Sequence, residues 1–270
     1  MKIYHLAFVL LPVLFSCQYG KSVTPGSSTF GIDVSHHQGK TDWKKTGEDL
    51  RLTGETIQTK PQSHVQRKDT LGLTVLYPKY TRMDLVCGTM PEKSDTTVIL
   101  VAEAAFTGQL LDTFNHRNVA GDHVSAGKRE RGYACGRNTG AFVAYKGKWE
   151  FCYQNYSKKL DEAALHGGMG FGQEMIIHNG EPVATVRRDS NKNQFRALSE
   201  HDRRLCIIES DSVVRFGDFK KMLLRYGVTH AIYLDMGSGW NHAWYRDGDK
   251  VRELHPKTHG YCTNWITFYR

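Results

Sequence analysis

The chain has 270 residues and a formal charge of +8, because 36 lysines and arginines stand against 28 aspartates and glutamates. Its aromatic content of 11% and charged content of 24% are ordinary for a globular protein that buries a core. The positive excess favours anionic partners such as phosphate groups. The basic residues are scattered and are not interleaved with aromatic residues, so we expect no nucleic-acid partner.

An apolar run near the N-terminus predicts export. It covers residues 6–15, follows a single lysine and is too short to span a bilayer, as in a signal peptide. The string Leu14-Phe15-Ser16-Cys17 resembles a bacterial lipobox, which implies cleavage before Cys17 and a lipid on its thiol. The alternative is an ordinary signal peptide with an incidental cysteine. We expect a signal peptide at 1–16 and a membrane-anchored lipoprotein in the periplasm or at the cell surface.

Composition divides the rest of the chain into three parts. Residues 17–29 are rich in Gly, Ser and Thr and suit a tether between lipid and domain. Residues 30–70 begin with a short motif and become polar, which predicts a loosely ordered segment. Dense apolar patterning over 71–270 predicts the folded catalytic domain.

Strand patterns dominate that domain. A β-branched run predicts a buried strand over 96–102, and one amphipathic helix begins near Asp218, as its cap, and ends at Gly227. The glycine-rich stretch 166–172 is expected to be a flexible turn. Two hairpins and two further strands are predicted, over 140–145 with 148–152, 243–246 with 250–254, 228–234 and 264–269. Many strands and few helices indicate a single α+β domain with mixed or antiparallel sheets.

Asp235 is the first candidate catalytic residue. It follows an apolar strand and precedes Met236-Gly237-Ser238-Gly239-Trp240, so its carboxylate is presented at the rim of a sheet. Glycines let a ligand approach the backbone, whose N–H groups can bind an anion. The alternative is a turn in which Asp235 only caps the following loop.

Several segments, in order, resemble the phosphodiester glycosidases, the family of the mannose-6-phosphate uncovering enzyme. The family signature Ala-x-x-Leu-Asp-Gly-Gly-Gly-Ser stands here as residues 231–239, with Met236 and Ser238 interrupting the glycines. Residues 203–208 resemble an arginine-led strand, and residues 101–107 lie where the family has Val-Asn-Gly-Gly-Phe-Phe, with Glu103 in place of the asparagine. The resemblance covers about residues 100–270 and implies a glycoside hydrolase.

The resemblance also implies a reaction, cleavage of the bond between a sugar and a phosphodiester. The leaving group is an anionic phosphate monoester, which an arginine fork suits; Arg204 is the leading candidate and Arg203 the second. Asp235 is expected to stabilise the oxocarbenium-like centre or to activate water, with Glu103 as its partner.

The expected ligand is a phosphorylated or phosphodiester-linked glycan. The residues that we expect to bind it are Asn138, Thr139, Gly237, Ser238, Gly239, Trp240 and His242. Asn138 and Thr139 could instead cap a hairpin, and Trp244 is expected in the core.

No metal site and no cofactor are predicted, although a divalent cation could help to hold the phosphate. His116, His123 and Asp122 could bind a metal, but they lack a spaced motif and are better explained by a solvated loop. Five cysteines remain beside Cys17, so at least one is free or pairs between chains.

A second, shorter resemblance supplies a rival function. Residues 30–39, with Asp42-Trp43, resemble the opening strand of barrel-type muramidases, in which the residue matching Asp33 lies in the active site. The rest of the chain lacks the alternation of a barrel, so we interpret the segment as grafted. A muramidase that uses Asp33, and a non-catalytic lipoprotein that binds phosphorylated glycans, are the alternatives to the hydrolase.

Overall fold

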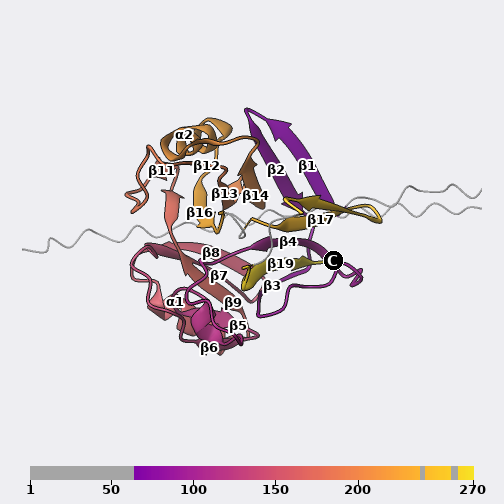
Figure 1. Cartoon of the computed structure of the whole chain (residues 1–270), viewed down its shortest axis with the longest axis vertical. Coiled ribbons are helices and arrows are strands. Elements are labelled where there is room, and N and C mark those ends of the chain that lie inside the picture. The colour runs from indigo at the N-terminus through magenta and orange to yellow at the C-terminus, as the bar shows by residue number, and fades with distance from the viewer. Residues whose placement is uncertain (1–63, 238–240, 257–260) are drawn as a thin grey trace, which may run out of the picture. The chain divides into compact units, whose positions relative to one another are not determined.

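The computed structural model describes residues 64–237, 241–256 and 261–270, all of which belong to one compact unit, Thr56–Arg270. These residues form three antiparallel sheets, a two-stranded ribbon and two α-helices (Figure 1). The expected strand-rich α+β fold is confirmed. The predicted signal peptide and tether, Cys17, the Asp33 segment and the loop residues Ser238, Gly239 and Trp240 lie outside the described residues.

The first sheet has seven strands and is antiparallel throughout. Its strands, in spatial order, are β1 (Val65–Thr70), β2 (Leu73–Pro78), β14 (Arg204–Ser210), β13 (Arg196–His201), β16 (His230–Leu234), β10 (Met175–His178) and β11 (Glu181–Pro182). Beside it, β12 (Lys192–Asn193) pairs with β15 (Val214–Arg215). The edge strand β1 lies within the segment expected to be loosely ordered, so the folded part begins before residue 71.

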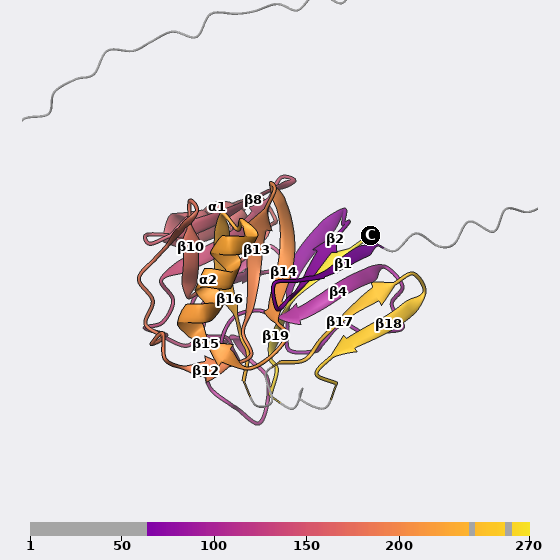
Figure 2. The same ribbon diagram turned by 90° about the horizontal axis from the view of Figure 1, so that it is seen from above.

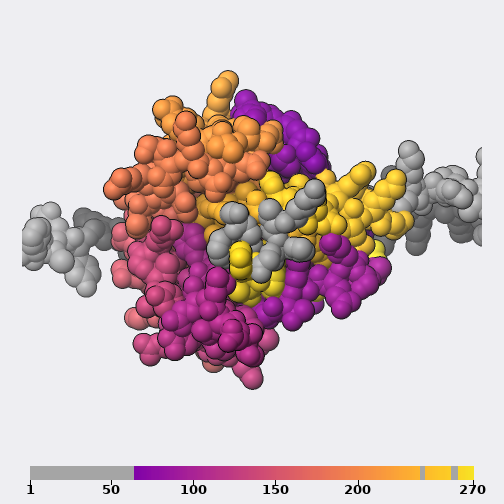
Figure 3. Space-filling model, viewed as in Figure 1, coloured from indigo at the N-terminus to yellow at the C-terminus, as the bar shows by residue number. Residues whose placement is uncertain are grey.

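Two five-stranded antiparallel sheets complete the fold. The second sheet contains, in order, β18 (Lys250–Leu254), β17 (Ala243–Asp247), β4 (Val98–Glu103), β19 (Asn264–Tyr269) and β3 (Arg82–Cys87). The third contains β6 (Lys128–Glu130), β5 (His123–Ser125), β9 (Met169–Gln173), β7 (Gly140–Tyr145) and β8 (Lys148–Tyr153). Figure 3 shows the C-terminal residues, in yellow, between the orange half that holds the first sheet and the magenta half that holds the third. Both predicted hairpins, β7–β8 and β17–β18, are confirmed.

The helices cover outer faces of the sheets. α2 (Phe216–Tyr226) crosses the outer face of the first sheet (Figure 2), α1 (Ser157–Leu165) packs on the third, and a 3₁₀ turn, η1 (His116–Asn118), lies in the loop after β4. Gly227 ends α2 in the left-handed conformation, as predicted, but Arg215 is the cap and Asp218 lies in the first turn, paired with Arg215. Neither α-helix in this part of the chain is long and apolar enough to cross a membrane.

The inner strands of the first sheet, such as β2, β14 and β16, are buried on both faces. Their successive apolar side chains point alternately to one face and the other. In β16, Ile232 and Leu234 pack into the core shared by the three sheets, whereas Ala231 and Tyr233 face the cluster under α2. This double burial explains why the strand is a continuous apolar run. It also means that β16 can present a polar group only where it ends.

The glycine-rich stretch 166–172 is only in part the flexible turn predicted: residues 166–168 form a turn after α1, whereas the chain from Met169 onward is the strand β9. β9 lies at the centre of the third sheet, between β5 and β7. The glycines permit close packing there: a Cβ on Gly168 would lie 2.2 Å from the carbonyl oxygen of Ala144. The chain then passes from β9 to β10, and so from the third sheet to the first, through the single residue Glu174.

Candidate active site

Asp235 lies at the junction between the first and second sheets. It follows the last residue of β16, and its backbone N–H donates to the carbonyl oxygen of Ala104, 3.1 Å away, directly after β4. The backbone N–H of Thr107 donates to the Asp235 carboxylate at 3.2 Å. Asp235 as a whole residue is half-buried. Asp235 therefore lies directly after the end of a strand, as expected.

Glu103 is the last residue of β4 and is completely buried. The hydroxyl of Thr107 donates to its Oε1 at 3.4 Å, and the thiol of Cys262 is a further polar neighbour. The backbone that follows is held by Asn264, whose side-chain amide accepts from the N–H of Ala105 at 2.8 Å and donates to its carbonyl at 3.0 Å. Asn264 thus determines the path of the chain between Glu103 and Thr107.

Both acids have raised pKa values. Burial raises the pKa of Asp235 to about 7, and the N–H of Thr107 and the charges of Arg187 and Arg137 offset this only in part. Burial first, and then the nearby charge of Asp235, raise the pKa of Glu103 well above its ordinary value. Asp235 is therefore close to its midpoint at neutral pH, and Glu103 favours its protonated form more than an exposed glutamate does. Two acids with raised pKa values can serve as proton donor and proton acceptor.

Arg187 is a cation beside Asp235 that the sequence did not indicate. Its guanidinium lies over the ring of Tyr233, with the central carbon 4.4 Å from the ring centroid. The buried Glu174 holds the same residue, because its Oε1 accepts from the backbone N–H of Arg187 at 2.8 Å and its Oε2 lies 3.5 Å from Nε. An ion pair and a ring contact thus hold the guanidinium of Arg187 in place, so it has little freedom to turn toward a ligand.

Arg137 is the more accessible cation. It is exposed, its charge lowers the pKa of Asp235, and its guanidinium carbon lies 5.6 Å from the centroid of the Phe106 ring. It directly precedes Asn138 and Thr139, two of the expected ligand-binding residues. Position and exposure therefore make Arg137 the guanidinium best placed to bind an anion at Asp235.

Asn138 is connected to Asp235 by a short chain of hydrogen bonds. Its Nδ2 donates to the carbonyl of Ala120 at 3.1 Å, and the N–H of Ala120 donates to the carbonyl of Phe106, next to Thr107. Its buried Oδ1 has no hydrogen-bond partner among the described residues. The hydroxyl of Thr139 instead accepts from the backbone N–H of Met175 at 3.0 Å, which is a structural contact with the start of β10.

The other expected ligand-binding residues are less informative. Gly237 is partly buried two residues after Asp235, at the start of the loop whose middle lies outside the described residues. The side chain of His242 is buried, and its Nε2 lies 3.1 Å from Glu253, which also pairs with Lys93. This contact directs the imidazole to β18. Trp244 is completely buried, as expected for a core residue.

Arg204, the leading candidate for the phosphate, does not lie at this site. It pairs with His201 in the β13–β14 ladder, whereas Arg196 pairs with Leu234, which precedes Asp235. Five residues separate Arg196 from His201, which is about 17 Å along a strand. Arg203 belongs to the turn that joins β13 and β14, with a φ of 58°. The hairpin thus carries both arginines to the far end of the sheet, and Arg204 there stacks on Tyr77.

A buried ion pair supports the base of the loop after Asp235. Arg196 is completely buried and donates through Nε and Nη2 to Glu209, at 2.9 and 2.6 Å, and through Nη2 to the carbonyl of Asn241 at 2.9 Å. His255 contacts the second oxygen of Glu209. The charges of Arg196 and His255 keep the pKa of Glu209 low despite its burial. The sequence analysis missed these ion pairs, and the signal that could have revealed them is a charged residue inside an apolar run, such as Arg196 or Glu174.

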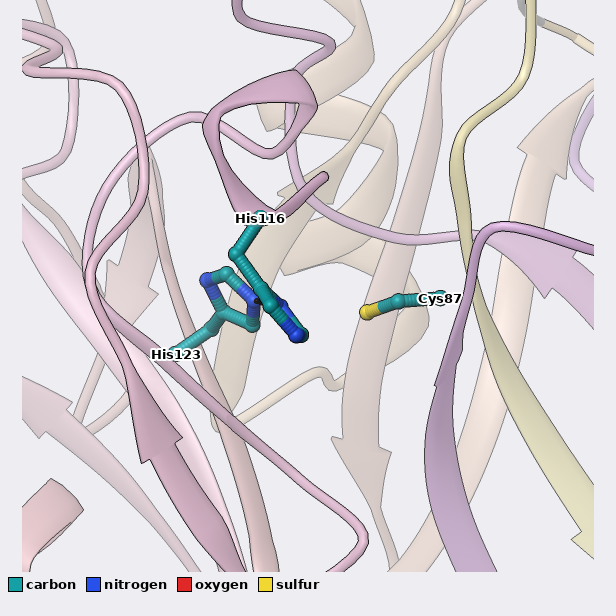
Figure 4. Close-up of side chains that lie close together, drawn as sticks. All are labelled: Cys87, His116 and His123. Carbon is teal, nitrogen blue, oxygen red and sulfur yellow. Dashed lines mark hydrogen bonds between the residues drawn. The ribbon is translucent and has the colours of Figure 1, made fainter. Parts of the chain in front are cut away.

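The histidines also differ from the expected solvated loop. His123 is completely buried, and its Nε2 lies 2.9 Å from Nδ1 of His116. Asp122 turns away from them and pairs with Arg129 at 2.7 Å. Cys87 takes its place beside the two imidazoles (Figure 4). None of the five cysteines after residue 64 is in a disulfide.

Comparison with known proteins gives a likeness in fold. No family model matches the sequence, and no curated protein matches it. Among solved structures, the catalytic domain of zebrafish N-acetylglucosamine-1-phosphodiester α-N-acetylglucosaminidase, auto-inhibited by its pro-peptide, is similar with a TM-score of 0.51 and 12% identity, over 76% of this chain and 81% of that one. A hypothetical protein from Synechocystis has a TM-score of 0.48 and 13% identity, over 76% of this chain and 61% of that one. The chain is thus similar in fold to a phosphodiester glycosidase catalytic domain.

Proposed function

We propose that this protein is an exported, lipid-anchored glycoside hydrolase that cleaves the bond between a sugar and a phosphodiester. The observation that carries the proposal is the pair of acids at one sheet junction, Glu103 buried and Asp235 partly exposed, both with raised pKa values. Perturbed acids of this kind are typical of catalytic sites. The similar fold of a phosphodiester glycosidase supports the choice of reaction.

In this proposal Asp235 acts as the base. Its carboxylate accepts a proton from water as the water oxygen bonds to the anomeric carbon, and the glycosidic C–O bond breaks with its electron pair going to the phosphate oxygen. A phosphate monoester is already a good leaving group, so its charge needs a cation more than a proton. Arg137 is the exposed guanidinium near Asp235 that can supply it. Glu103, whose raised pKa favours the protonated form, is then the hydrogen-bond donor of the pair.

The pH dependence of hydrolysis follows from these roles. Activity rises as Asp235 ionises, so kcat/KM should increase through about pH 7. Because the pKa of Glu103 is raised as well, activity should fall again at higher pH when Glu103 ionises. An activity that is constant across neutral pH would contradict the assignment of Asp235 as the base.

The test is the release of free sugar from a synthetic sugar phosphodiester by the full chain. Asp235→Asn should reduce release at least ~100-fold, as expected for loss of a general base, and the exposed Asp112→Asn is the matched control. Arg137→Ala should raise KM, whereas Arg204→Ala at the far end of the sheet should change nothing. Binding of the diester without release of sugar would identify a non-catalytic glycan-binding protein instead.

Lipid anchoring has its own test. Cys17→Ala should remove the lipid and release the protein from the membrane fraction. Clearing of peptidoglycan that depends on Asp33 would favour the muramidase.

A further inference from the structure

Three metal-binding side chains from separate parts of the chain meet on the side of β3 that faces the third sheet. Cys87 is the last residue of β3, His116 begins η1 and His123 begins β5. One ligand atom of each lies within 4.8 Å of the others. Figure 4 shows the two imidazoles side by side, with the sulfur of Cys87 directed toward them. The hydroxyl of Ser125, which donates to the carbonyl of Leu85 at 2.8 Å, connects β5 to β3 at this point.

The spacing of the two imidazole nitrogens is close to that of a tetrahedral ion, and the sulfur of Cys87 lies within 4.8 Å of them. Zn²⁺ binds imidazole nitrogen at about 2.0–2.1 Å and thiolate sulfur at about 2.3 Å, which places two nitrogen ligands about 3.3 Å apart and nitrogen and sulfur about 3.6 Å apart. Nδ1 of His116 and Nε2 of His123 are 2.9 Å apart, so they need to separate by only a few tenths of an ångström. Cys87 and His116 are partly exposed, which leaves a fourth position for water.

The other nitrogen of each ring has the partner that a metal ligand requires. Nδ1 of His123 lies 3.1 Å from the carbonyl oxygen of Gly121, which only accepts, so this nitrogen carries the proton and Nε2 is free to bind a cation. Nε2 of His116 lies 3.7 Å from the carboxylate of Glu130, the cross-strand partner of His123. A carbonyl and a carboxylate behind ligating histidines are the usual outer partners of zinc sites.

A hydrogen bond between two neutral imidazoles explains the arrangement less well. Nδ1 of His116 must then donate to His123, and its Nε2 faces Glu130 without a proton, so two acceptors oppose each other. A cation between the rings lets Nε2 of His116 keep its proton, which then faces the Glu130 carboxylate 3.7 Å away. A thiolate and the Glu130 carboxylate also balance the two charges of Zn²⁺.

We propose that Cys87, His116 and His123 bind a Zn²⁺ ion, with Glu130 and the carbonyl of Gly121 orienting the two imidazoles. The site would fasten the long connection between β4 and β5, which carries Thr107. In η1, the carbonyl of Asn118 accepts from the N–H of Gly108, next to Thr107. The ion thus has a structural role close to Asp235, and the proposal does not depend on the reaction proposed above.

Metal binding is tested on the full chain carrying Cys17→Ser, which removes the expected lipidation and its thiol. Competition with a chromophoric chelator should give one Zn²⁺ per chain. Cys87→Ser and His123→Gln should each weaken binding at least as much as Glu130→Gln, for which roughly 10- to 100-fold is expected. Cys135→Ser, a partly exposed cysteine outside the cluster, is the matched control and should bind as the parent does.

Two measurements on the unsubstituted cluster cover the case in which these variants do not fold. Co²⁺ in place of Zn²⁺ should give the ligand-field bands of a four-coordinate ion and a thiolate charge-transfer band. Zn²⁺ should also slow alkylation of Cys87 but not of Cys135. A Co²⁺ complex without the thiolate band, equal alkylation with and without Zn²⁺, or Zn²⁺ affinity unchanged in Cys87→Ser would overturn the proposal.

Discussion

The half-buried acid Asp235, at the end of β16, should make the protein less stable as the pH rises, and Asp235→Asn should remove much of this dependence. Burial raises the pKa of Asp235 from 3.8 to about 7. Between these two values the folded state binds more protons at this group than the unfolded state does. The free energy of unfolding therefore falls with increasing pH across that window and is constant, for this group, below and above it.

The magnitude follows from the difference in pKa. At 1.36 kcal/mol for each pH unit, a change from 3.8 to about 7 corresponds to at most about 4 kcal/mol lost between pH 4 and pH 7.5. Asparagine has nearly the same shape and can accept the N–H of Thr107, but it carries no charge. The charge of Asp235 also raises the pKa of Glu103, so the substitution reduces a second contribution of the same sign.

Urea unfolding of the parent, Asp235→Asn and the exposed control Asp112→Asn, at several values between pH 4 and pH 8, measures this dependence. We expect Asp235→Asn to gain stability relative to the parent as the pH rises, with little difference at pH 4. Asp112→Asn should follow the parent throughout. Parallel curves for Asp235→Asn and the parent would show that Asp235 ionises as easily in the folded protein as in the unfolded chain, and would refute the reasoning.

Two further predictions concern packing. Arg196→Leu leaves Glu209 buried without its ion-pair partner and should lower the free energy of unfolding by about 3–5 kcal/mol. Adding Glu209→Leu should recover part of the loss, and a double variant no more stable than the single one would contradict this. Gly168→Ala should be destabilising because its Cβ would meet the carbonyl of Ala144, whereas Gly136→Ala, with no atom within 4 Å of its Cβ, should be close to neutral. Similar thermal stability of these two glycine variants would mean that the backbone just before β9 can shift at little cost.

Features that depend on neighbouring residues could be predicted from the sequence. The hairpin β7–β8 was expected at Lys146-Gly147, and both residues have the positive φ angles that its tight turn needs. The end of α2 at Gly227 follows the same logic, because glycine adopts the left-handed conformation at little cost. Asp235 belongs to this class too, since an apolar strand followed by glycines specifies where a side chain leaves the sheet.

Features that depend on residues far apart in the chain could not be predicted from the sequence. Arg204 was expected to bind the phosphate at the same site as Asp235, but the turn at Asp202-Arg203 places it at the opposite end of the ladder. The whole stretch 166–172 was predicted to be a flexible turn because the sequence does not show which backbone lies against its glycines, as Ala144 does against Gly168.

The sequence by itself thus determined the two hairpins, the strand before Asp235, the end of α2 and the acid at the tip of β16, because backbone geometry and apolar periodicity are properties of adjacent residues. Only the tertiary structure decided that Arg137 and Arg187, and not Arg204, lie near Asp235. It alone brought Cys87 within reach of His116 and His123. The physical reason is that ion pairs and metal sites depend on distances of a few ångströms, and antiparallel pairing between distant strands sets those distances.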